Sequence, residues 1–303
     1  MTVRRLLVLG QSGQLATALA RLADPSIWDV ARINRTIADF SDPRQALSAL
    51  RQQPDFDVAI NAVACNDVDG AETDEREAQA VNGETPGLLA EYCAATGRPF
   101  LHVSTDFVFP GRAGGGYVET DAPQPPNAYG RSKLAGEHGV LDAGKQHAVF
   151  RTAWVYSADH RNFVTAMLGL VGKHERVRVV ADQIGNPTFA DDLALALLEA
   201  ARLLDLREAK GGLYHLAGTG QTSRAALAER IFELAAPLLG NCPAVEPITS
   251  DAWPAPAARP TDASLRSDRF ARTFSHQMPD WETSLPSVVT AWCRNALSAR
   301  AKP

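Results

Sequence analysis

The fold of this chain is decided by the stretch RRLLVLGQSGQLA, residues 4–16. Residues 5–9 form a short apolar run that ends at Gly10, a pattern typical of a buried strand. Residues 13–23 are rich in alanine and leucine and predict a helix immediately after that strand. A strand that passes through a glycine-rich turn into a helix is the first unit of an α/β fold.

The turn between the expected strand and helix has small residues at Gly10, Gly13 and Ala16, in the spacing GxxGxxA. Glycine lets the backbone turn tightly and approach a pyrophosphate closely. The helix N-terminus that follows presents unbonded N–H groups and the positive end of its dipole to such an anion. Glycines in such a turn also occur for structural reasons alone, but the position of this motif favours a dinucleotide-binding site at Gly10 and Gly13.

The same alternation of strand and helix continues along the first half of the chain. Further apolar runs occupy residues 57–64, 100–104 and 148–152, and helical patterns occupy residues 86–96 and the segment from about 128. Alternation at this spacing implies βαβ units with right-handed crossovers and helices on both faces of a parallel sheet. We therefore expect an α/β fold, a Rossmann-type doubly wound parallel sheet, with its cofactor domain in residues 1–150.

The second half of the chain is less regular. Helices are predicted at residues 191–205, where Asp191 and Asp192 suit the first turn, and at 223–236. A proline-rich connection follows at 252–260. We expect a smaller α/β substrate-binding region, drawn mainly from residues 151–177 and 209–303, with the sheet domain returning near 178–208.

The composition narrows the classes of protein to which the chain can belong. Its 303 residues include 30 Lys and Arg against 35 Asp and Glu, a formal net charge of −5, which disfavours nucleic-acid binding. No window approaches the roughly 18 apolar residues of a membrane span. The four cysteines, Cys65, Cys93, Cys242 and Cys293, form no CxxC motif, which excludes a zinc ribbon. We expect a cytoplasmic enzyme with neither a nucleic acid nor a membrane as partner.

The segment around residue 34 bears on the choice of cofactor. About 20 residues beyond the glycine turn, an acidic residue would bind the ribose 2′-hydroxyl of NAD. Asn34 stands near that position, with Arg35 beside it. A neutral amide next to a guanidinium suits a 2′-phosphate, so we expect Asn34 and Arg35 to bind NADPH, with NADH as the alternative donor. The other interpretation is that these residues are solvated surface groups.

Tyr129 and Lys133 form the most specific pair in the sequence. Residues four apart on a helix share one face. A tyrosine has an unperturbed pKa of about 10, and a neighbouring ammonium lowers it, which suits a proton donor to a carbonyl oxygen. Thr105 follows the expected strand at 100–104, where side chains face the ligand crevice of an α/β sheet. The alternative is a solvated helix face on which the pair has no catalytic role.

Several segments carry a resemblance to a known family. They are GQSGQLA (10–16), ADFSDP (38–43), VDGAE (68–72), STDFVFPG (104–111), ETDAPQPPNAYGRSKLAGE (119–137), FRTAWVY (150–156), DQIGNPT (182–188), GLYHLAGTG (212–220) and ARP (258–260). Over nearly its whole length the chain resembles the extended short-chain dehydrogenase/reductase family, in particular its branch of dTDP-4-dehydrorhamnose reductases. The resemblance implies NADPH-dependent reduction of the C4 keto group of a dTDP-4-keto-6-deoxy sugar, giving dTDP-L-rhamnose.

The resemblance also implies a role for individual residues. Thr105, Tyr129 and Lys133 match the catalytic residues, with Tyr129 as proton donor, and Tyr129 and Lys133 also border the cofactor. The other implied cofactor residues are Gly13, Gln14 and Leu15 at the pyrophosphate, Asp39 and Phe40 at the adenine, and Ala64, Cys65 and Asn66 at a strand end. The implied sugar-nucleotide residues are Val68, Asp69, Thr105, Asp106 and Trp154. Arg259 has the geometry to pair with a diphosphate, and it is equally consistent with a surface arginine.

Two departures from the family leave alternatives open. The family usually has Ala-Ala-(His/Tyr)-Thr where this chain has Val63-Ala64-Cys65-Asn66. A reductase or synthase for another dTDP-4-keto-6-deoxy sugar, or a non-catalytic NADP-binding regulatory subunit of the same fold, therefore stays open. Ala18 occupies the position of a glutamate that binds magnesium in some members, so we expect no metal, and we expect a monomer or a homodimer.

Overall fold

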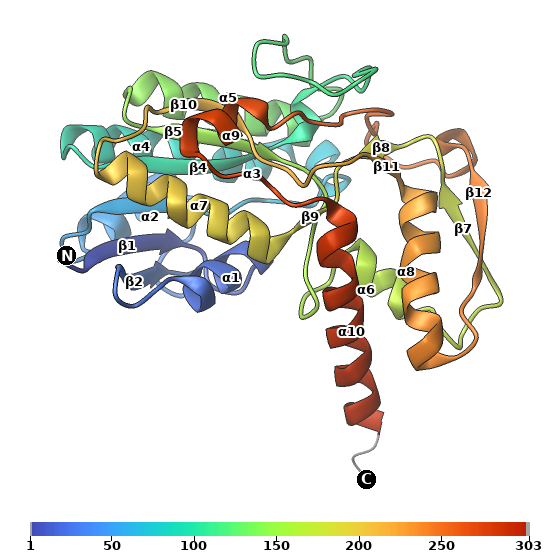
Figure 1. Ribbon diagram of the computed structural model, residues 1–303. Helices are drawn as coiled ribbons and strands as arrows, with labels where there is room; N and C mark the ends of the chain where they lie inside the picture. Colours follow the sequence, from blue (N-terminus) through green and yellow to red (C-terminus); the bar gives the residue numbers. More distant parts are fainter. Residues whose placement is uncertain (1, 301–303) are drawn as a thin grey trace.

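The computed structural model of the protein describes residues 2–300 (Figure 1). Its main element is a six-stranded sheet with the order β10-β5-β4-β3-β1-β2, in which every neighbouring pair is parallel. The strands are β1 (Arg4–Leu9), β2 (Trp28–Ile33), β3 (Val58–Asn61), β4 (Phe100–Thr105), β5 (Ala148–Thr152) and β10 (Gly212–His215). The chain moves from β1 to β2 on one side and then to β3 on the other, so the topological switch point lies between β1 and β3. The expected Rossmann-type sheet is confirmed.

Helices cover both faces of the sheet, as Figure 1 shows. The helices on one face are α1 (Gln14–Leu22), α7 (Ala190–Asp205) and α9 (Asp268–Phe274), and those on the other are α2 (Pro43–Arg51), α4 (Thr85–Ala95) and α5 (Ala128–Ala143). Leu6 and Val8 of β1 pack in the first layer, whereas Leu7 and Leu9 pack in the second. Because side chains of a strand alternate between faces, a strand covered on both sides must be apolar throughout.

A buried ion pair joins helix α5 to the sheet. Arg151 on β5 donates from Nη2 to Oε2 of Glu137 at 2.6 Å and from Nε to Oε1 at 2.8 Å. The two side chains are 2% and 1% exposed. Ser104 on β4 donates to the same carboxylate at 2.6 Å. Since leaving either charge unpaired in the core would cost several kcal/mol, about 3–5, this contact holds α5, β4 and β5 in one arrangement.

Helix α5 also lies very close to the segment that precedes α4. That segment is η2 (Gln79–Glu84), a turn of π-helix after η1 (Gly70–Glu72) and α3 (Glu75–Ala78). A Cβ atom added at Gly136 would lie 2.1 Å from the carbonyl oxygen of Asn82. The Asn82 side chain in turn holds the backbone of Cys65 and the hydroxyl of Ser132. Gly136 therefore sets the distance between α5 and the loop after β3.

A second, smaller region lies beyond the carboxyl ends of the strands (Figure 1). It has three two-stranded ladders: β6 (Val155–Tyr156) with β9 (Thr188–Phe189), β7 (Arg176–Val180) with β12 (Ala244–Ile248), and β8 (Ile184–Gly185) with β11 (Thr222–Ser223). Its helices are α6 (Phe163–Leu168), α8 (Arg224–Leu239) and α10 (Trp281–Arg300), and short 3-10 turns lie at η3 (Asp106–Val108) and η4 (Ser250–Ala252). Tyr156, Ile231 and Leu285 belong to a core of its own.

The sheet takes its last strand from the second half of the chain. Strand β10 pairs with β5, and α9 packs on the same side as α7. The expected return near 178–208 includes α7, but β7 pairs with β12 away from the sheet, and β10 lies in the range expected for the substrate region. Strand β10 has four residues, too few for a clear apolar run. The assignment of the two regions to cofactor and substrate stays a prediction.

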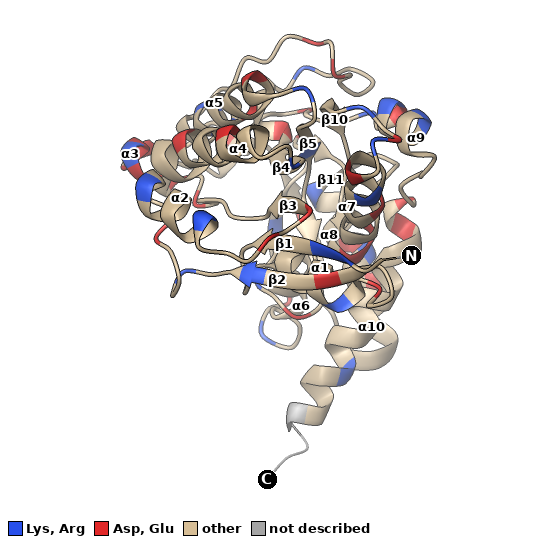
Figure 2. Ribbon diagram, turned by 90° about the vertical axis from the view of Figure 1, so that its left-hand side faces the viewer, with Lys and Arg blue, Asp and Glu red and all other residues tan. Residues whose placement is uncertain are grey.

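The expected helices occur close to their predicted bounds. The predictions at 86–96 and 191–205 correspond to α4 and α7, and Asp191 and Asp192 lie in the first turn of α7. The sequence did not predict β2 or α2, because β2 is an edge strand with exposed Asp29 among its apolar residues. Across residues 2–300, no helix is both long and apolar enough to span a bilayer. Acidic and basic residues intermingle over the helices in Figure 2.

Gly136→Ala tests the close packing of α5. Helix propensity alone would stabilise the variant by about 1 kcal/mol. The new methyl group must displace the Asn82 carbonyl, so we expect a net loss of about 1–3 kcal/mol in the free energy of unfolding. Urea unfolding measures the change. His138→Ala, at an exposed position of the same helix, is the control and should differ little; a more stable Gly136→Ala protein would contradict the packing.

Candidate active site

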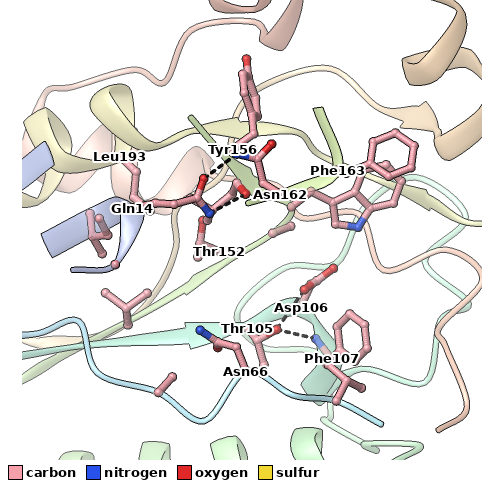
Figure 3. A pocket seen from close by; sticks show the side chains of 18 of the residues that line it. Gln14, Asn66, Thr105, Asp106, Phe107, Thr152, Tyr156, Asn162, Phe163 and Leu193 are labelled. Atoms are coloured by element: carbon pink, nitrogen blue, oxygen red, sulfur yellow. Dashed lines mark hydrogen bonds between the residues drawn. The ribbon is translucent and has the colours of Figure 1, made fainter. Parts of the chain in front are cut away.

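A cavity of about 530 Å³ opens at the carboxyl ends of β1, β3, β4 and β5 (Figure 3). This volume is in the range of small-molecule sites. The expected site residues that line it are Gly13, Gln14, Leu15, Ala64, Asn66, Val68, Thr105, Asp106, Tyr129, Lys133, Trp154 and Arg259. Other expected residues are outside its lining: Gly10, Asn34, Arg35, Asp39, Phe40, Cys65 and Asp69. The cavity lies at the switch point of the sheet, where α/β proteins bind ligands.

The glycine turn leaves the N-terminus of α1 open toward this cavity. Gly10 has φ +116°, and a Cβ there would lie 3.3 Å from the Cβ of Ala16. Gly13 is the N-cap of α1, makes no side-chain capping hydrogen bond, and has no atom within 4 Å of an added Cβ. The first N–H groups of a helix need partners from outside it. The turn therefore fits a pyrophosphate, which would accept hydrogen bonds from these groups.

Gln14 connects the turn to the smaller region across the cavity. Its Nε2 donates to the carbonyl of Val155 at 3.2 Å, and its Oε1 accepts from Ser157 Oγ at 2.9 Å and from Asn162 Nδ2 at 3.0 Å. Figure 3 shows Gln14 and Asn162 directed toward one another. Asn162 also caps helix α6. The Gln14 side chain therefore fixes the position of the 155–162 segment as well as lining the site.

Thr105 and Tyr129 lie on the same cavity wall. Thr105 ends β4, donates from Oγ1 to Asp106 Oδ1 at 3.0 Å and accepts from the N–H of Phe107 at 3.2 Å (Figure 3). The Tyr129 hydroxyl donates to Asn66 Oδ1 at 3.4 Å. Both residues are largely buried. The structure thus places a threonine hydroxyl and a phenol around a space that a substrate carbonyl could enter.

Lys133 is held against strand β4. Its Nζ donates to the carbonyl of Val103 at 2.6 Å and lies 3.3 Å from Nε2 of His102. Asn61 accepts from the N–H of Val63 through Oδ1, so its amide nitrogen faces Nδ1 of His102 at 3.1 Å. Nδ1 of His102 is therefore placed to accept from Asn61, and burial together with the Lys133 charge holds the pKa of this histidine well below its usual value. Burial lowers the pKa of Lys133 to about 8, and the amine is still mostly protonated at neutral pH.

The expectation that Lys133 lowers the pKa of Tyr129 stays a prediction, because burial is the largest influence on this phenol. Burial raises the pKa of the Tyr129 phenol above its usual value, with a smaller opposing effect from Thr105. The Lys133 amine faces Val103 and His102, and Lys133 is not among the groups that shift the Tyr129 pKa. Tyr129 is accordingly a protonated phenol, the form that a proton donor requires.

The residues expected at the ribose lie at the end of β2. Asn34 Oδ1 accepts from the N–H of Thr36 at 2.9 Å and of Ile37 at 3.1 Å, and its Nδ2 donates to Gln11. Within residues 2–300, the exposed Arg35 side chain makes neither a hydrogen bond nor an ion pair. Asn34 therefore shapes the turn, whereas the Arg35 guanidinium is available to a phosphate. Hydrogen bonds from Ser41 hold the pKa of Asp39 below its usual value.

Asp69 and Arg259 form an ion pair at the edge of the cavity. Arg259 donates from Nη1 to Oδ1 of Asp69 at 3.0 Å and from Nη2 to Oδ2 at 2.8 Å. The N–H of Ala257 donates to the same carboxylate at 3.1 Å. The Arg259 bonds hold the pKa of Asp69 below its usual range. Since Asp69 already neutralises Arg259, the expected pairing of Arg259 with a diphosphate would have to compete with a two-point hydrogen bond.

Cys65 is half-buried, and its backbone is held by the side chain of Asn82 at 2.9 and 3.0 Å. Burial raises the pKa of its thiol, as expected for a structural cysteine rather than a nucleophile. Ala64 and Asn66 on either side of it line the cavity. The role of Cys65 is therefore to fix the loop that carries its neighbours.

Asp106, Trp154 and Arg224 also line the cavity. Asp106 is 3% exposed, and burial raises its pKa to about 7. Trp154 has an unusual positive φ of +45°, and the Arg224 guanidinium lies 3.5 Å from the centre of its indole ring. The sequence did not predict a role for Arg224, since its one signal was a place at the start of the helix expected at 223–236.

A parallel sheet with a glycine turn at its switch point, facing a threonine, a tyrosine and a lysine across one cavity, defines a Rossmann-type oxidoreductase. The family model described as RmlD substrate binding domain matches residues 4–293, and the chain belongs to this family. The resemblance that the sequence motifs indicated is thereby confirmed.

Relatives and solved structures agree with this assignment. The chain is 38% identical to the dTDP-4-dehydrorhamnose reductase of Sinorhizobium fredii, over 95% of this chain and 97% of that one. It is 36% identical to the reductase of the same name from Escherichia coli, over 94% and 96%. A crystal structure of dTDP-4-dehydrorhamnose reductase from Bacillus anthracis in complex with NADP has a TM-score of 0.88 at 29% identity, covering 96% of this chain and 100% of that one.

Asp106→Asn tests the burial of the Asp106 carboxyl. Its pKa is about 7 in the folded protein and about 3.9 in an unfolded chain. The stability that the protonated carboxyl contributes to the wild-type protein is therefore lost as pH rises through this interval. Asparagine carries no such penalty. We expect the unfolding free energy of the variant, relative to wild type, to increase by on the order of 2–4 kcal/mol between pH 5 and pH 8. Urea unfolding across that range measures it, and a constant difference would contradict the assignment.

Proposed function

We propose that the protein uses NADPH to reduce the C4 keto group of dTDP-4-dehydro-L-rhamnose, giving dTDP-L-rhamnose. One observation carries the proposal: Thr105, Tyr129 and Lys133 meet at one cavity with the glycine turn, in a chain that belongs to this reductase family. The names of the relatives and the NADP complex of the similar crystal structure support the substrate and the cofactor. A cytoplasmic location and a monomeric or dimeric state stay predictions.

The cofactor would extend along the carboxyl edge of the sheet. Gly13 and Leu15, at the N-terminus of α1, would bind the pyrophosphate, and the exposed Arg35 would bind the 2′-phosphate of the adenosine ribose. Ala64 and Asn66 line the same cavity next to Tyr129 and complete the edge toward the substrate. NADPH bound there supplies the hydride for the reduction.

The protein's own residues orient the carbonyl and supply a proton. The Tyr129 phenol donates its proton to the oxygen that becomes the hydroxyl, and burial keeps that phenol protonated until reaction. The Thr105 hydroxyl hydrogen-bonds the same oxygen in exchange for its bond to Asp106. Lys133, one helical turn from Tyr129, would stabilise the phenolate that Tyr129 leaves behind with the charge of its ammonium group. With a pKa of about 8, Lys133 carries this charge at neutral pH.

Tyr129→Phe removes the proton donor and leaves the ring in place. We expect kcat to fall by roughly 100-fold or more, the usual cost of losing a general acid, with the affinity for NADPH unchanged. NADPH oxidation at 340 nm, with dTDP-4-dehydro-L-rhamnose made in situ, measures kcat. Tyr92→Phe, at a half-buried tyrosine of α4 away from the cavity, is the control.

The outcomes of this experiment separate the proposed activity from its neighbours. Wild-type oxidation with dTDP-L-rhamnose as product supports the proposal, and a different stereochemistry of the product would identify another keto-sugar reductase. A Tyr129→Phe protein with near-normal turnover would refute the role of Tyr129. A wild-type protein that binds NADPH and never oxidises it with this sugar would overturn the reductase assignment.

Arg35→Met tests the choice between NADPH and NADH. If the exposed guanidinium binds the 2′-phosphate, the KM for NADPH should rise about ten- to one-hundredfold, as expected for one charge-assisted hydrogen bond. The KM for NADH, which has no such phosphate, should stay the same. Arg176→Met on β7, another exposed arginine, is the matched control. Equal changes for the two cofactors, or none, would place the 2′-phosphate elsewhere.

A further inference from the structure

Arg224, the first residue of α8, has an unusual environment. Its guanidinium lies 3.5 Å from the centre of the Trp154 ring and 4.9 Å from the centre of the Phe163 ring. Trp154 is held for this contact: its backbone is left-handed, and a Cβ added at Gly185 would lie 2.5 Å from the indole. Local strain of this kind is retained where the surroundings enforce it, often at binding sites. The two aromatic rings thus fix the position of one cationic group.

The charge of Arg224 has no direct partner among residues 2–300. Its guanidinium makes no hydrogen bond there, and no carboxylate oxygen lies within 4 Å of it. The nearest charged groups are Asp106, which raises the Arg224 pKa, and Arg259, which lowers it; burial, the largest effect, brings that pKa down to about 10. The charge of Arg259 is taken up by Asp69. Arg224 is therefore a half-buried cation that has no direct partner among residues 2–300.

The geometry of the stack determines what Arg224 can bind. A guanidinium that lies over a ring uses its face, so the N–H donors along its edge stay available. Arg224 lines the main cavity and also the small recess beside it, formed with Gln183, Ile184, Pro260 and Ala263. A planar fork of N–H donors facing a cavity suits the oxygens of a phosphate group.

We propose that Arg224 binds the diphosphate of the sugar-nucleotide substrate. The inference rests on the proposed function for the substrate class, and it assigns the anion to a residue other than Arg259. Diphosphate oxygens would accept hydrogen bonds from the guanidinium edge while Trp154 and Phe163 hold its face. Arg259, bound to Asp69, then acts as a positioning residue that shapes the cavity edge.

A purely structural role for Arg224, as the counter-charge of Asp106, accounts less well for the geometry. The two groups lie farther apart than an ion pair, and Asp106 is engaged by the Thr105 hydroxyl instead. With the substrate bound, the Arg224 guanidinium would contact the diphosphate and Asp106 would lie beside the sugar. The two roles predict different behaviour toward ligands that carry or lack phosphate.

Calorimetric titration of the whole protein with dTDP, thymidine and NADPH tests the proposal. In Arg224→Met, an unbranched side chain still covers Trp154, but the charge and the donors are lost. We expect the dissociation constant for dTDP to rise about ten- to one-hundredfold, with thymidine and NADPH binding unchanged. Arg224→Lys should recover part of the loss, because it restores the charge without the planar fork. Arg230→Met, at a partly exposed arginine of the same helix that is not part of the cavity lining, is the control and should bind dTDP as wild type does.

Three outcomes would overturn the proposal: a wild-type protein that does not bind dTDP, an Arg224→Met protein that binds dTDP normally, or an equal loss of dTDP and thymidine affinity. The last would assign Arg224 to the aromatic wall alone. Because these titrations need no turnover, they are independent of the proposed reaction. A selective loss of dTDP affinity in a protein that reduces no keto sugar would support Arg224 and refute the reaction. Normal dTDP affinity in Arg224→Met, together with reduction of the keto sugar by the wild-type protein, would refute the proposal for Arg224 and support the reaction.

Discussion

The ion pair between Glu137 and Arg151 is the contact on which the site depends. It lies in the core, where a charge without a partner is costly, so helix and sheet can pack in few other arrangements. Helix α5 carries Tyr129 and Lys133 on the turns before Glu137, and β4 and β5 end at the cavity. Gly136 completes the constraint, because it lets the helix approach the Asn82 carbonyl closely. The buried ion pair and the absence of a Cβ atom at Gly136 together position the side chains of Tyr129 and Lys133.

The charges of the site follow from burial more than from neighbouring charges. Burial raises the pKa of Tyr129 and brings that of Asp106 to about 7, and it lowers that of Lys133 to about 8. Burial thereby keeps Tyr129 neutral and leaves Asp106 partly neutral at neutral pH, whereas Lys133 is still mostly protonated. Arg224 remains cationic against Trp154, and Lys133, Arg161 and Arg259 line the same cavity, so an anionic substrate would meet a lining with several cationic groups. Such a cavity favours phosphate groups over other polar ligands.

The cavity is closed by contacts between residues far apart in the chain. Gln14 in the first turn reaches Val155 and Asn162 in the smaller region. Asp69, in the loop after β3, reaches Arg259 near the other end of the chain. These contacts join the sheet to the smaller region on two sides of the same space. A ligand bound between them would contact residues of both regions at once.

The sequence by itself determined the parallel sheet, the helices that alternate with it and the positions of the glycine turn, Thr105, Tyr129 and Lys133. These features are local: the apolar periodicity of a strand, the small residues of a turn and the four-residue spacing of a helix face are properties of short segments. Edge strand β2 and short β10 escaped prediction because their segments carry weak patterns. The tertiary structure alone decided that Lys133 faces His102, that Asp69 neutralises Arg259 and that Arg224 stacks on Trp154. Such pairings depend on the path of the chain through space, since the partners are 31 to 190 residues apart in the first two and 70 in the third, and no periodicity extends over such distances.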